Sequence, residues 1–564
     1  NEFFVAKIST IRTDLSAMET LVGDLSCPPV HSLLVPCSSK LVSFKPTTAS
    51  EITSIIKKAS NTSCPLDPIP IRLLHDVLPA LAPLITQIVN ASLLTGTFPS
   101  ELKSAIVQPL LKKLGSDCNF LKNFRPVSNL SFLSKVIEKV IASRLVNHMT
   151  ENNLMDPMQS AYRKGHSTET ALLRVHNDVV SAVDKGHGVC LVLLDLSAAF
   201  DTIDHTVLLT FLREHIGLGG QVLDLFQSYL TGRSQCVSIE GVLSELSELA
   251  YGVPQGSVLG PVEFCIYTIP IGAILRHYNI NYQIYADDTQ LYCSFELDSF
   301  DEIFSSICAC ISDIRSWMIT NKLKINDDKT ELLIISSPHA KFSVDVELAI
   351  GQSHIKPTSA CKSLGVMLDN HFKMDKQIKN ICRSTHFHLR NISTIRHLLP
   401  DSAAAQLVHS LVTSRLDYCN SLLNGIPGCR IYPLQRVQNI AARVVSRCSR
   451  YDDIDQILET LHWLPIIYRV QFKMLLLVYK CKNNLGPEYL CKLLIPYKKE
   501  RTLRNNSKNL LDRPHSIHKS YGDRAFGYAG SIMWNYLPLD IKLAPSICVF
   551  KTKLKTHLFK QCFG

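Results

Sequence analysis

Acidic residues at two places far apart in the sequence lie in contexts in which they could take part in catalysis. Asp195 ends the apolar run 188-GVCLVLLD-195, and Asp287 and Asp288 stand side by side in 281-NYQIYADDTQLYCSF-295. If these segments are neighbouring strands of one sheet, Asp195 and Asp287 converge at its edge, where two carboxylates repel each other unless cations bridge them. Two unrelated turn aspartates would give the same pattern.

Oxygen-only ligands of this kind suit Mg²⁺, which keeps several waters and shares the phosphates of its substrate. Two such ions about 3.5–4 Å apart can activate a 3′-hydroxyl and stabilise a leaving pyrophosphate. The aspartates therefore predict nucleotidyl transfer with two Mg²⁺ ions, and the pair of unrelated turns is the alternative.

The elements that must position these residues follow from the apolar periodicity. An amphipathic helix is predicted at 131–149, a helix capped by Ser-Thr-Glu-Thr at 167–185, a buried strand at 188–195 and a hairpin at 281–295. We further expect helices at 1–60 (with a Pro-rich break at 27–46), 71–94, 198–231 and 298–321, an apolar segment at 262–275, strands at 234–240, 322–336 and 344–368, and helices from 374 onward. This order favours an α+β sheet with helices on one face.

The charge of the chain is unevenly distributed. Of the net charge of +10, residues 1–370 carry −8, residues 371–450 carry +9, residues 451–480 carry −1 and residues 481–564 carry +10. A basic region of this size predicts a polyanionic partner, with a merely basic solvated surface as the alternative. The 564 residues exceed one core, so three or four domains are expected.

Several classes of protein are disfavoured. The 19 cysteines include no Cys-x-x-Cys, which favours buried reduced thiols in an intracellular protein over a zinc site. No stretch approaches 18 uncharged apolar residues, so no membrane span is predicted. The first residues lack both an initiating Met and the apolar core of a signal peptide, so we expect a fragment of a longer reading frame.

Five segments in order resemble the palm motifs of reverse transcriptases. They are 191-LVLLDLSAAFDTIDH-205, 252-GVPQGSVLGP-261, 285-YADDTQLY-292, 322-KLKINDDKTE-331 and 361-CKSLGV-366. Residues 122–141 and 159–173 resemble the fingers of non-LTR (LINE) retrotransposons, above all the Jockey-like branch, whose C-terminal region resembles 461–480 and 549–559. The resemblance covers nearly the whole chain.

This resemblance implies a right-hand polymerase with fingers, a palm built on an antiparallel sheet and a helical thumb. The implied domains are an N-terminal helical extension at 1–100, fingers and palm at 101–370, a basic thumb at 371–450 and a basic, mostly helical, nucleic-acid-binding region at 451–564. Lys373, Lys376, Lys379 and Arg383 would follow phosphates along a duplex.

The implied activity is RNA-directed DNA synthesis that extends a DNA 3′-end, by target-primed reverse transcription in the parent element. Template RNA, primer or target DNA and dNTPs are the implied partners, and no membrane is expected. We expect synthesis in the nucleus and assembly in the cytoplasm. The endonuclease that precedes this region in the branch is not expected in the chain.

The resemblance assigns the reaction centre to a few residues. Asp195, Asp287 and Leu196 take the metal positions, and Asp288 is a supporting acid. Lys329 is the candidate general acid that protonates the leaving pyrophosphate, with a solvated turn lysine as the alternative.

A second group of residues is implied in substrate binding. Phe200 would exclude a 2′-hydroxyl, unless it only packs in the core, and Gln255 and Gly256 would meet the nucleotide or template. Arg163 is favoured for the triphosphate and Arg125 for the triphosphate or the template backbone, with surface ion pairs as the alternative. Leu364, Gly365 and Val366 resemble a primer grip, although a packed hairpin explains them equally well.

One residue departs from the pattern. Glu263 occupies a position where the family usually has an apolar side chain, and a buried unpaired carboxylate costs several kcal/mol or stays protonated. This departure favours a second reading, a degenerate relic that binds nucleic acid with little catalysis. A third reading, an RNA-dependent RNA polymerase, is disfavoured by Phe200.

Overall fold

The computed structural model describes residues 1–19, 30–59, 64–113, 115–340, 346–351, 353–497 and 509–564. The chain forms two compact units that alternate along the sequence. Unit 1 consists of Asn1–Tyr162, Asp195–Ile280 and Ile307–Asp328, and unit 2 of Arg163–Leu194, Asn281–Ser306 and Lys329–Gly564. The division into four consecutive domains stays a prediction.

Unit 1 combines helices with one larger sheet. Its helices are α1 (Glu2–Glu19), α2 (Val30–Leu33), α3 (Ala49–Lys57), α4 (Ile71–Asp76), α5 (Leu78–Thr95), α6 (Phe132–Glu151), α8 (His205–Glu214), α9 (Gly220–Leu230), α10 (Gly260–Tyr267) and α11 (Ile269–His277). Its strands are β1 (Ser104–Leu111), β2 (Phe124–Asn129), β4 (Leu196–Ser197), β5 (Arg233–Ile239), β6 (Val242–Leu243), β7 (Ser247–Leu249) and β10 (Lys324–Ile325).

The larger sheet of unit 1 has the order β2-β1-β5-β6, and β7 also pairs with β5. β1 runs parallel to β5 and antiparallel to β2. Neither β1 nor β2 was predicted from the sequence, because Pro109 and Pro126 lie directly opposite each other in this pair and proline usually argues against a strand. The short pair β4–β10 is separate from this sheet.

Helix α6 shows why the helical predictions near the site were correct. Ser131 caps its first turn by accepting a hydrogen bond from the backbone N–H of Ser134, and its apolar residues at helical spacing are buried. Glu138 is buried on the same helix, although a glutamate would ordinarily face water.

Helix α5 corrects one expectation. Within the described residues it is one helix that is long and apolar enough to cross a membrane by length and composition. The expectation that no stretch has this character is therefore wrong, because Pro79 and Pro83 do not interrupt the helix as the sequence reading assumed. α5 also packs against α3 and α9, and 28% of this apolar stretch is buried.

Unit 2 holds the second sheet and most of the C-terminal helices. Its helices are α7 (Thr168–Asp184), α13 (Asp375–Ile395), α14 (Asp401–Val408), α15 (Ser414–Asp417), α16 (Gly428–Ser446), α17 (Ile454–Thr460), α18 (Ile466–Lys482), α19 (Glu488–Cys491), α20 (Phe526–Tyr536), α21 (Leu539–Lys542) and α22 (Ile547–Phe563). Its strands are β3 (Gly188–Leu194), β8 (Asn281–Tyr285), β9 (Asp288–Phe295), β11 (Glu331–Ile335), β12 (Leu348–Ile350), β13 (Ser353–Ile355), β14 (Ala360–Ser363) and β15 (Val366–Asp369). Helix α12 (Phe300–Thr320) runs from unit 2 into unit 1.

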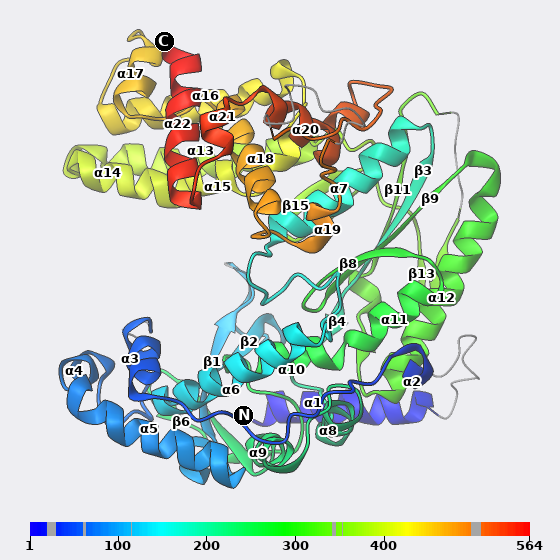
Figure 1. Ribbon diagram of the computed structural model, residues 1–564, viewed down its shortest axis with the longest axis vertical. Helices are drawn as coiled ribbons and strands as arrows, with labels where there is room; N and C mark the ends of the chain where they lie inside the picture. The colour runs from blue at the N-terminus through cyan, green and yellow to red at the C-terminus, as the bar shows by residue number, and fades with distance from the viewer. Residues whose placement is uncertain (20–29, 60–63, 114, 341–345, 352, 498–508) are drawn as a thin grey trace. The chain divides into compact units, whose positions relative to one another are not determined.

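The sheet of unit 2 is antiparallel, with the order β11-β3-β9-β8. Every residue of β3 is buried, as expected for the inner strand of a covered sheet. Helix α7 packs on β3 and β8 of this sheet (Figure 1). The strand at 188–195, the hairpin at 281–295 and the mixed α+β class are therefore confirmed.

Helix α7 also reaches the C-terminal helices of the same unit through buried polar groups. Asp184 accepts hydrogen bonds from the backbone N–H groups of Ile517 (2.8 Å) and His518 (2.7 Å). Asn177 accepts one from the N–H of Gly527 (3.1 Å). The helix is thus shared by the sheet and by the helical region that ends the chain.

Candidate active site

The candidate site begins at one edge of the sheet of unit 2. Leu194, the last residue of β3, lies opposite Thr289 on β9, and Leu193 lies opposite Glu331 on β11. The end of β3 and the starts of β9 and β11 therefore meet at the same edge. Asp288 opens β9 at this edge, and Lys329, which is exposed, lies two residues before Glu331, the first residue of β11.

The hairpin turn between β8 and β9 carries Asp287. Tyr285 pairs with Asp288, so Ala286 and Asp287 form a two-residue turn. Ala286 has a φ of 56°, whereas Asp287 does not have a positive φ, which is the pattern of a type II′ turn. Glycine normally takes the first position of this turn, and a side chain there costs about 1–2 kcal/mol. Strain of this kind gathers at functional sites, where the surrounding structure maintains it.

Asp195 follows Leu194 directly and belongs to unit 1, where it is half-buried. Asn326 donates from its backbone N–H to the carbonyl of Asp195 (2.9 Å) and from its Nδ2 to the carboxylate Oδ2 (3.2 Å). Leu196 pairs with Ile325 between β4 and β10. Asn326 was not singled out as a site residue, although it lies in the segment 322–331 that carried the resemblance.

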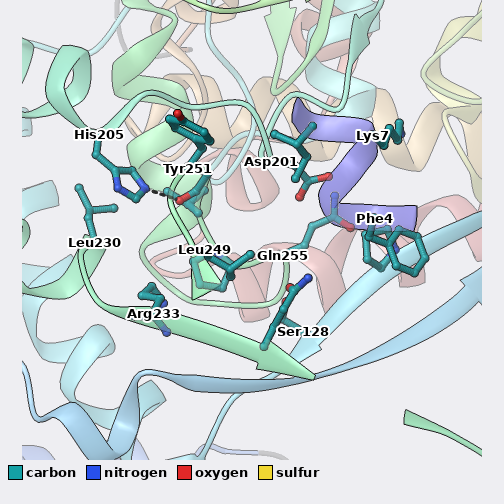
Figure 2. Close-up of a pocket in the computed structure, with 16 residues that line it drawn as sticks. Phe4, Lys7, Ser128, Asp201, His205, Leu230, Arg233, Leu249, Tyr251 and Gln255 are labelled. Carbon is teal, nitrogen blue, oxygen red and sulfur yellow. Dashed lines mark hydrogen bonds between the residues drawn. The ribbon is translucent and has the colours of Figure 1, made fainter. Parts of the chain in front are cut away.

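The Gly-rich loop at 252–256 is tied to the residues that follow Asp195. The N–H of Gly252 donates to the carbonyl of Ile203 (2.8 Å), and the N–H of Val253 to that of Phe200 (2.9 Å). His205 contacts the carbonyl of Gly252 through Nε2 (2.8 Å), as the dashed line in Figure 2 marks. The two predicted segments are therefore one structural assembly within unit 1.

Gly256 shows why the loop needs glycine. Its φ is 126°, and a Cβ there would lie 2.4 Å from the carbonyl oxygen of Ser128 on β2. The N–H of Ser128 in turn donates to the carbonyl of Gln255 (2.7 Å). The loop is thus held against β2, the strand that also carries Arg125.

Gln255 lines a small cavity with Ser128, Asp201 and Arg233, and Phe4 and Lys7 of α1 contribute from the other side (Figure 2). Within the part of the chain that the structure describes, the buried Oε1 of Gln255 has no hydrogen-bond partner. The cavity measures about 40 Å³, which suits a few water molecules and no nucleotide. Burial raises the pKa of the Asp201 carboxyl to about 6.

Phe200 is half-buried, and its ring stacks on the fully buried Phe264 with centroids 4.8 Å apart. The neighbouring Glu263 is fully buried, and neither of its oxygens has a hydrogen-bond partner among the described residues. Burial and the charge of Glu138 raise the pKa of Glu263 to about 8. The carboxyl is therefore buried close to a second buried carboxyl, Glu138, at a position where the resemblance implies an apolar side chain.

Glu138 was missed by the sequence analysis, yet it organises the start of α10. Its Oε2 accepts hydrogen bonds from the backbone N–H groups of Val258 (2.6 Å) and Leu259 (3.1 Å), and its Oε1 accepts one from Ser134 Oγ (3.0 Å). Burial nevertheless raises the pKa of this carboxyl. A glutamate on the apolar face of the helix at 131–149 was the signal in the sequence.

The two candidate arginines belong to different units. Arg125 lies on β2 opposite Leu110 and is exposed, whereas Arg163 is half-buried at the start of unit 2. The carbonyl of Arg163 accepts a hydrogen bond from the N–H of His166 (3.2 Å). The structure therefore does not bring the two guanidinium groups together within one unit.

The hairpin β14–β15 has the tight turn that was expected there. Ser363 pairs with Val366, and both turn residues have positive φ, 44° at Leu364 and 83° at Gly365. This is the type I′ pattern. The hydroxyl of Tyr418 donates to the carbonyl of Leu364 (2.7 Å), which fixes the turn against the C-terminal helices of unit 2.

Helix α1 adds a residue that the sequence analysis did not find. The guanidinium of Arg12 forms an ion pair with Asp204 (2.5 Å) and lies 3.6 Å from the centre of the Tyr251 ring. Arg12 therefore holds the segment after Phe200 and the residue before Gly252 at once. Burial alone would raise the pKa of Asp204, but Arg12 and backbone N–H groups outweigh it and the pKa is lowered.

Among the residues that the structure describes, no three His, Cys, Asp or Glu side chains gather as a metal site. Mg²⁺ is commonly bound by only one or two carboxylates, with waters and substrate phosphates completing its shell. The carboxylates of Asp195 and Asp287 and the backbone carbonyl of Leu196 are oxygen donors of the right chemistry. The donor set therefore fits a hard divalent cation that also needs its substrate.

Comparisons with known proteins show what the chain is similar to. Residues 111–368 match the family described as reverse transcriptase (RNA-dependent DNA polymerase). The chain is 28% identical over 415 residues to "Probable RNA-directed DNA polymerase from transposon X-element" of Drosophila melanogaster, which covers 71% of this chain and 44% of that protein. It is also 28% identical over 376 residues to "RNA-directed DNA polymerase from mobile element jockey" of Drosophila funebris, covering 63% and 39%. The chain thus spans less than half the length of these relatives.

Proposed function

We propose that the chain, whose residues 111–368 match the reverse transcriptase family, is an RNA-directed DNA polymerase of a Jockey-like non-LTR retrotransposon. Its substrates would be a template RNA, a DNA strand with a free 3′-end and dNTPs. The names of the X-element and jockey relatives support this reading. In a parent element the reaction would be target-primed reverse transcription in the nucleus.

One observation carries the proposal: the register of β3 against β9. Leu194 lies opposite Thr289, Asp195 follows Leu194 in the chain and Asp287 precedes Thr289 by two residues. The sheet edge is therefore continuous in sequence with both candidate metal ligands, while Asp288 supports the turn as the first residue of β9.

We assign the binding of divalent cations, two Mg²⁺ ions, to Asp195 and Asp287, with the carbonyl of Leu196 as a further donor. Bound there, such ions would supply Lewis-acid activation of the primer 3′-hydroxyl and neutralise phosphate charge. Asn326 holds the Asp195 carboxylate in place through the hydrogen bond from Nδ2 (3.2 Å).

The remaining roles belong to one lysine and two arginines. Lys329 is exposed two residues before the start of β11, and its ammonium would donate a proton to the leaving pyrophosphate. Arg163 would grip the triphosphate as a bidentate donor, and Arg125, exposed on β2, would bind the template backbone.

Phe200 and Gln255 would act on the incoming nucleotide. The stack on Phe264 holds the Phe200 ring in place, so that it would exclude a ribose 2′-hydroxyl by steric contact. Gln255 and Gly256 lie on the loop anchored to β2, which supports a role against the nucleotide or template. This chemistry favours DNA synthesis over RNA synthesis.

At a larger scale we propose the right-hand layout, with residues 101–370 as fingers and palm and residues 371–450 as thumb. The antiparallel sheet β11-β3-β9-β8 supports the palm assignment. Helix α13 carries Lys376, Lys379 and Arg383 and is preceded by Lys373, and this basic helix supports the thumb. The N-terminal helices and residues 451–564 would flank this polymerase.

Primer extension on an RNA template tests the proposal. We expect cDNA synthesis that requires Mg²⁺ and dNTPs, and Asp287→Asn should lower its rate by at least about 100-fold because a metal-binding charge is lost. The matched control is Asp301→Asn, the same chemical change at an exposed aspartate in the first turn of α12. Equal rates in the two variants would contradict the assignment of Asp287.

A relic that binds nucleic acid without appreciable catalysis is the second candidate. The fully buried Glu263, which has no hydrogen-bond partner among the described residues, favours it because such a change destabilises the site. If the unmodified chain binds RNA but makes no cDNA, and Glu263→Leu restores synthesis, the relic reading is correct.

A further inference from the structure

A second cavity lies within unit 2, lined by residues of α15, α18 and α22, by His409 and by the segment that precedes α18. Its volume is about 510 Å³, and its lining includes His409, Trp463, Asn420, Arg469, Lys551 and Lys555. Cavities of about 300–1,000 Å³ accommodate small organic groups. We call it the α18–α22 cavity, and none of the residues assigned to nucleotide addition lines it.

One wall of this cavity is aromatic. Trp463 is 8% exposed, and the ring of the exposed His409 lies 5.4 Å from it, centroid to centroid. His409 begins a π-helical turn, His409–Thr413, between α14 and α15. Such turns are uncommon and frequently mark functional sites. The wall thus presents two aromatic rings, tilted by 59° to each other, next to a position with unusual backbone geometry.

Another part of the cavity lining is cationic. Lys551 and Lys555 are exposed on α22, and in the described part of the chain neither makes an ion pair. Lys473 also lines the cavity and pairs with Glu169 at 3.1 Å, and Arg469 is neutralised by Asp417, with its Nε 2.8 Å from Oδ1. Burial and the charges of Lys551 and Lys473 lower the pKa of the nearby Lys480. The unneutralised charge is therefore concentrated at Lys551 and Lys555.

Asn420 supplies a third kind of contact. It is 3% exposed, and its Oδ1 is buried without a hydrogen-bond partner among the described residues, while its Nδ2 reaches Asp417 Oδ1 at 3.4 Å. A buried acceptor without a donor costs about 1–3 kcal/mol. Because the side chain lines the cavity, a ligand that brings an N–H group would satisfy it.

We propose that the α18–α22 cavity binds single-stranded nucleic acid, taking one or two nucleotides. The base stacks on the exposed ring of His409, beside Trp463, and donates to Asn420 Oδ1, and the flanking phosphates contact Lys551 and Lys555. A phosphate alone would leave the aromatic wall and the asparagine unused, and a double helix is too wide for the volume. The inference rests on the proposed function, because a polymerase on an RNA template always has an unpaired strand.

Photocrosslinking locates this contact directly. The full chain is mixed, without Mg²⁺ or dNTPs, with ten-nucleotide single strands of RNA or DNA that carry one 4-thiouridine or 4-thiothymidine. After irradiation we expect crosslinked peptides from 401–420 or 455–480, and the RNA and DNA arms show which strand is bound. Crosslinks confined to peptides of unit 1 would overturn the proposal.

Two double variants test the cationic side. Lys551→Ala with Lys555→Ala should lower the crosslink yield at these peptides about tenfold, and reduce the slope of log affinity against log salt by about 1.4. The matched control, Lys553→Ala with Lys560→Ala, removes the same charge from the same helix at positions that do not line the cavity. If both double variants lose the same crosslink yield, the effect comes from the overall positive charge of α22, and the proposed site is refuted.

The stacking wall has its own variant. His409→Ala truncates an exposed ring, so folding is retained, and the crosslink yield should fall about fivefold. Competition by a free mononucleotide as strong as that by the ten-mer would overturn the assignment to a strand. Asp287→Asn should crosslink like the unmodified chain, so a failure of polymerisation and a failure of this cavity remain distinguishable.

Discussion

At the scale of single residues, Glu263 sets a pH dependence. Its pKa is about 8 in the folded chain, because burial and Glu138 disfavour the charge, against 4.5 when unfolded. Between these two pKa values the folded state holds a proton that the unfolded state has lost. The stability that the neutral carboxyl contributes is therefore fully present below pH 4.5 and is lost as the pH rises toward 8. The loss between pH 5 and pH 7 amounts to about 2 kcal/mol.

Glu263→Gln should remove this dependence, because the amide cannot ionise. The free energy of unfolding, measured with urea, should decrease less from pH 5 to pH 7 in this variant than in the unmodified chain. We expect the difference between the two decreases to be about 2 kcal/mol. Glu302→Gln, the same change at an exposed position of α12, serves as control. An identical pH profile in the Glu263 variant would show that this carboxyl is ionised in the fold.

At the scale of elements, α1 acts as a brace on unit 1. Asn1 donates through Nδ2 to the carbonyl of Gln235 (3.2 Å) at one end, Lys322 pairs with Glu19 at the other, and Arg12 lies between them. Phe4 packs with Val107 and Val237. The helix thereby connects the larger sheet, the Gly-rich loop and the region before β10.

Arg12→Ala should lower the free energy of unfolding by about 2 kcal/mol, because it leaves the largely buried Asp204 without its guanidinium and removes the contact with Tyr251. If Arg12 positions the Gly-rich loop, kcat of primer extension falls as well. Arg12→Lys keeps the charge without the planar stack and should recover stability only in part.

Lys322→Ala is the matched control for this prediction. It breaks a second ion pair of α1, with Glu19, that touches neither Asp204 nor Tyr251. Exposed pairs contribute about 0–1 kcal/mol, so we expect a small loss of stability and an unchanged kcat. A loss of kcat equal to that of Arg12→Ala would mean that α1 acts as a whole and Arg12 has no particular part.

The elements of the two units show which features could be predicted from the sequence. The helix at 131–149, the buried strand and the hairpin were predicted because their apolar periods are regular and local. Glu138, Asp184 and Arg12 were not recognised, because each is a charged residue whose burial depends on partners more than a hundred residues away. A single sequence carries no sign of such pairings, and the roles assigned to Asp195 and Asp287 stay predictions.

At the scale of the whole molecule, we expect a fragment of the C-terminal region to fold only if it includes α7. Twelve of its residues are buried, and its polar side chains bind backbone groups of the C-terminal region. A fragment of residues 371–564 would contain α13 to α22 but lack this helix. The predicted thumb and C-terminal region are thus joined to a segment that precedes them by nearly two hundred residues.

We expect the fragment 371–564 to lack a cooperative thermal transition, because removal of α7 exposes apolar surface and leaves the N–H groups of Ile517 and His518 without Asp184. Circular dichroism and size-exclusion chromatography would measure this. In the full chain, Asp184→Asn should lower the free energy of unfolding by about 2 kcal/mol. The control Asp512→Asn, the same change at an exposed site, should leave it unchanged. A fragment that melts at the temperature of the full chain would contradict this dependence.

The pairing of β3 has a consequence for synthesis of the chain on the ribosome. β3 leaves the ribosome well before β9 and β11, and the last pairing, Ile335 with Val189, joins residues nearly 150 positions apart, which corresponds to roughly 10–30 s of translation. Until β9 follows, nearly 100 positions after β3, the seven residues of β3, all buried in the finished sheet, have no strand beside them, and the side that pairs with β11 stays open longer. During that interval the nascent chain therefore exposes an unpaired, apolar strand that can associate with other chains. The yield of folded protein depends on whether another molecule or segment covers this strand.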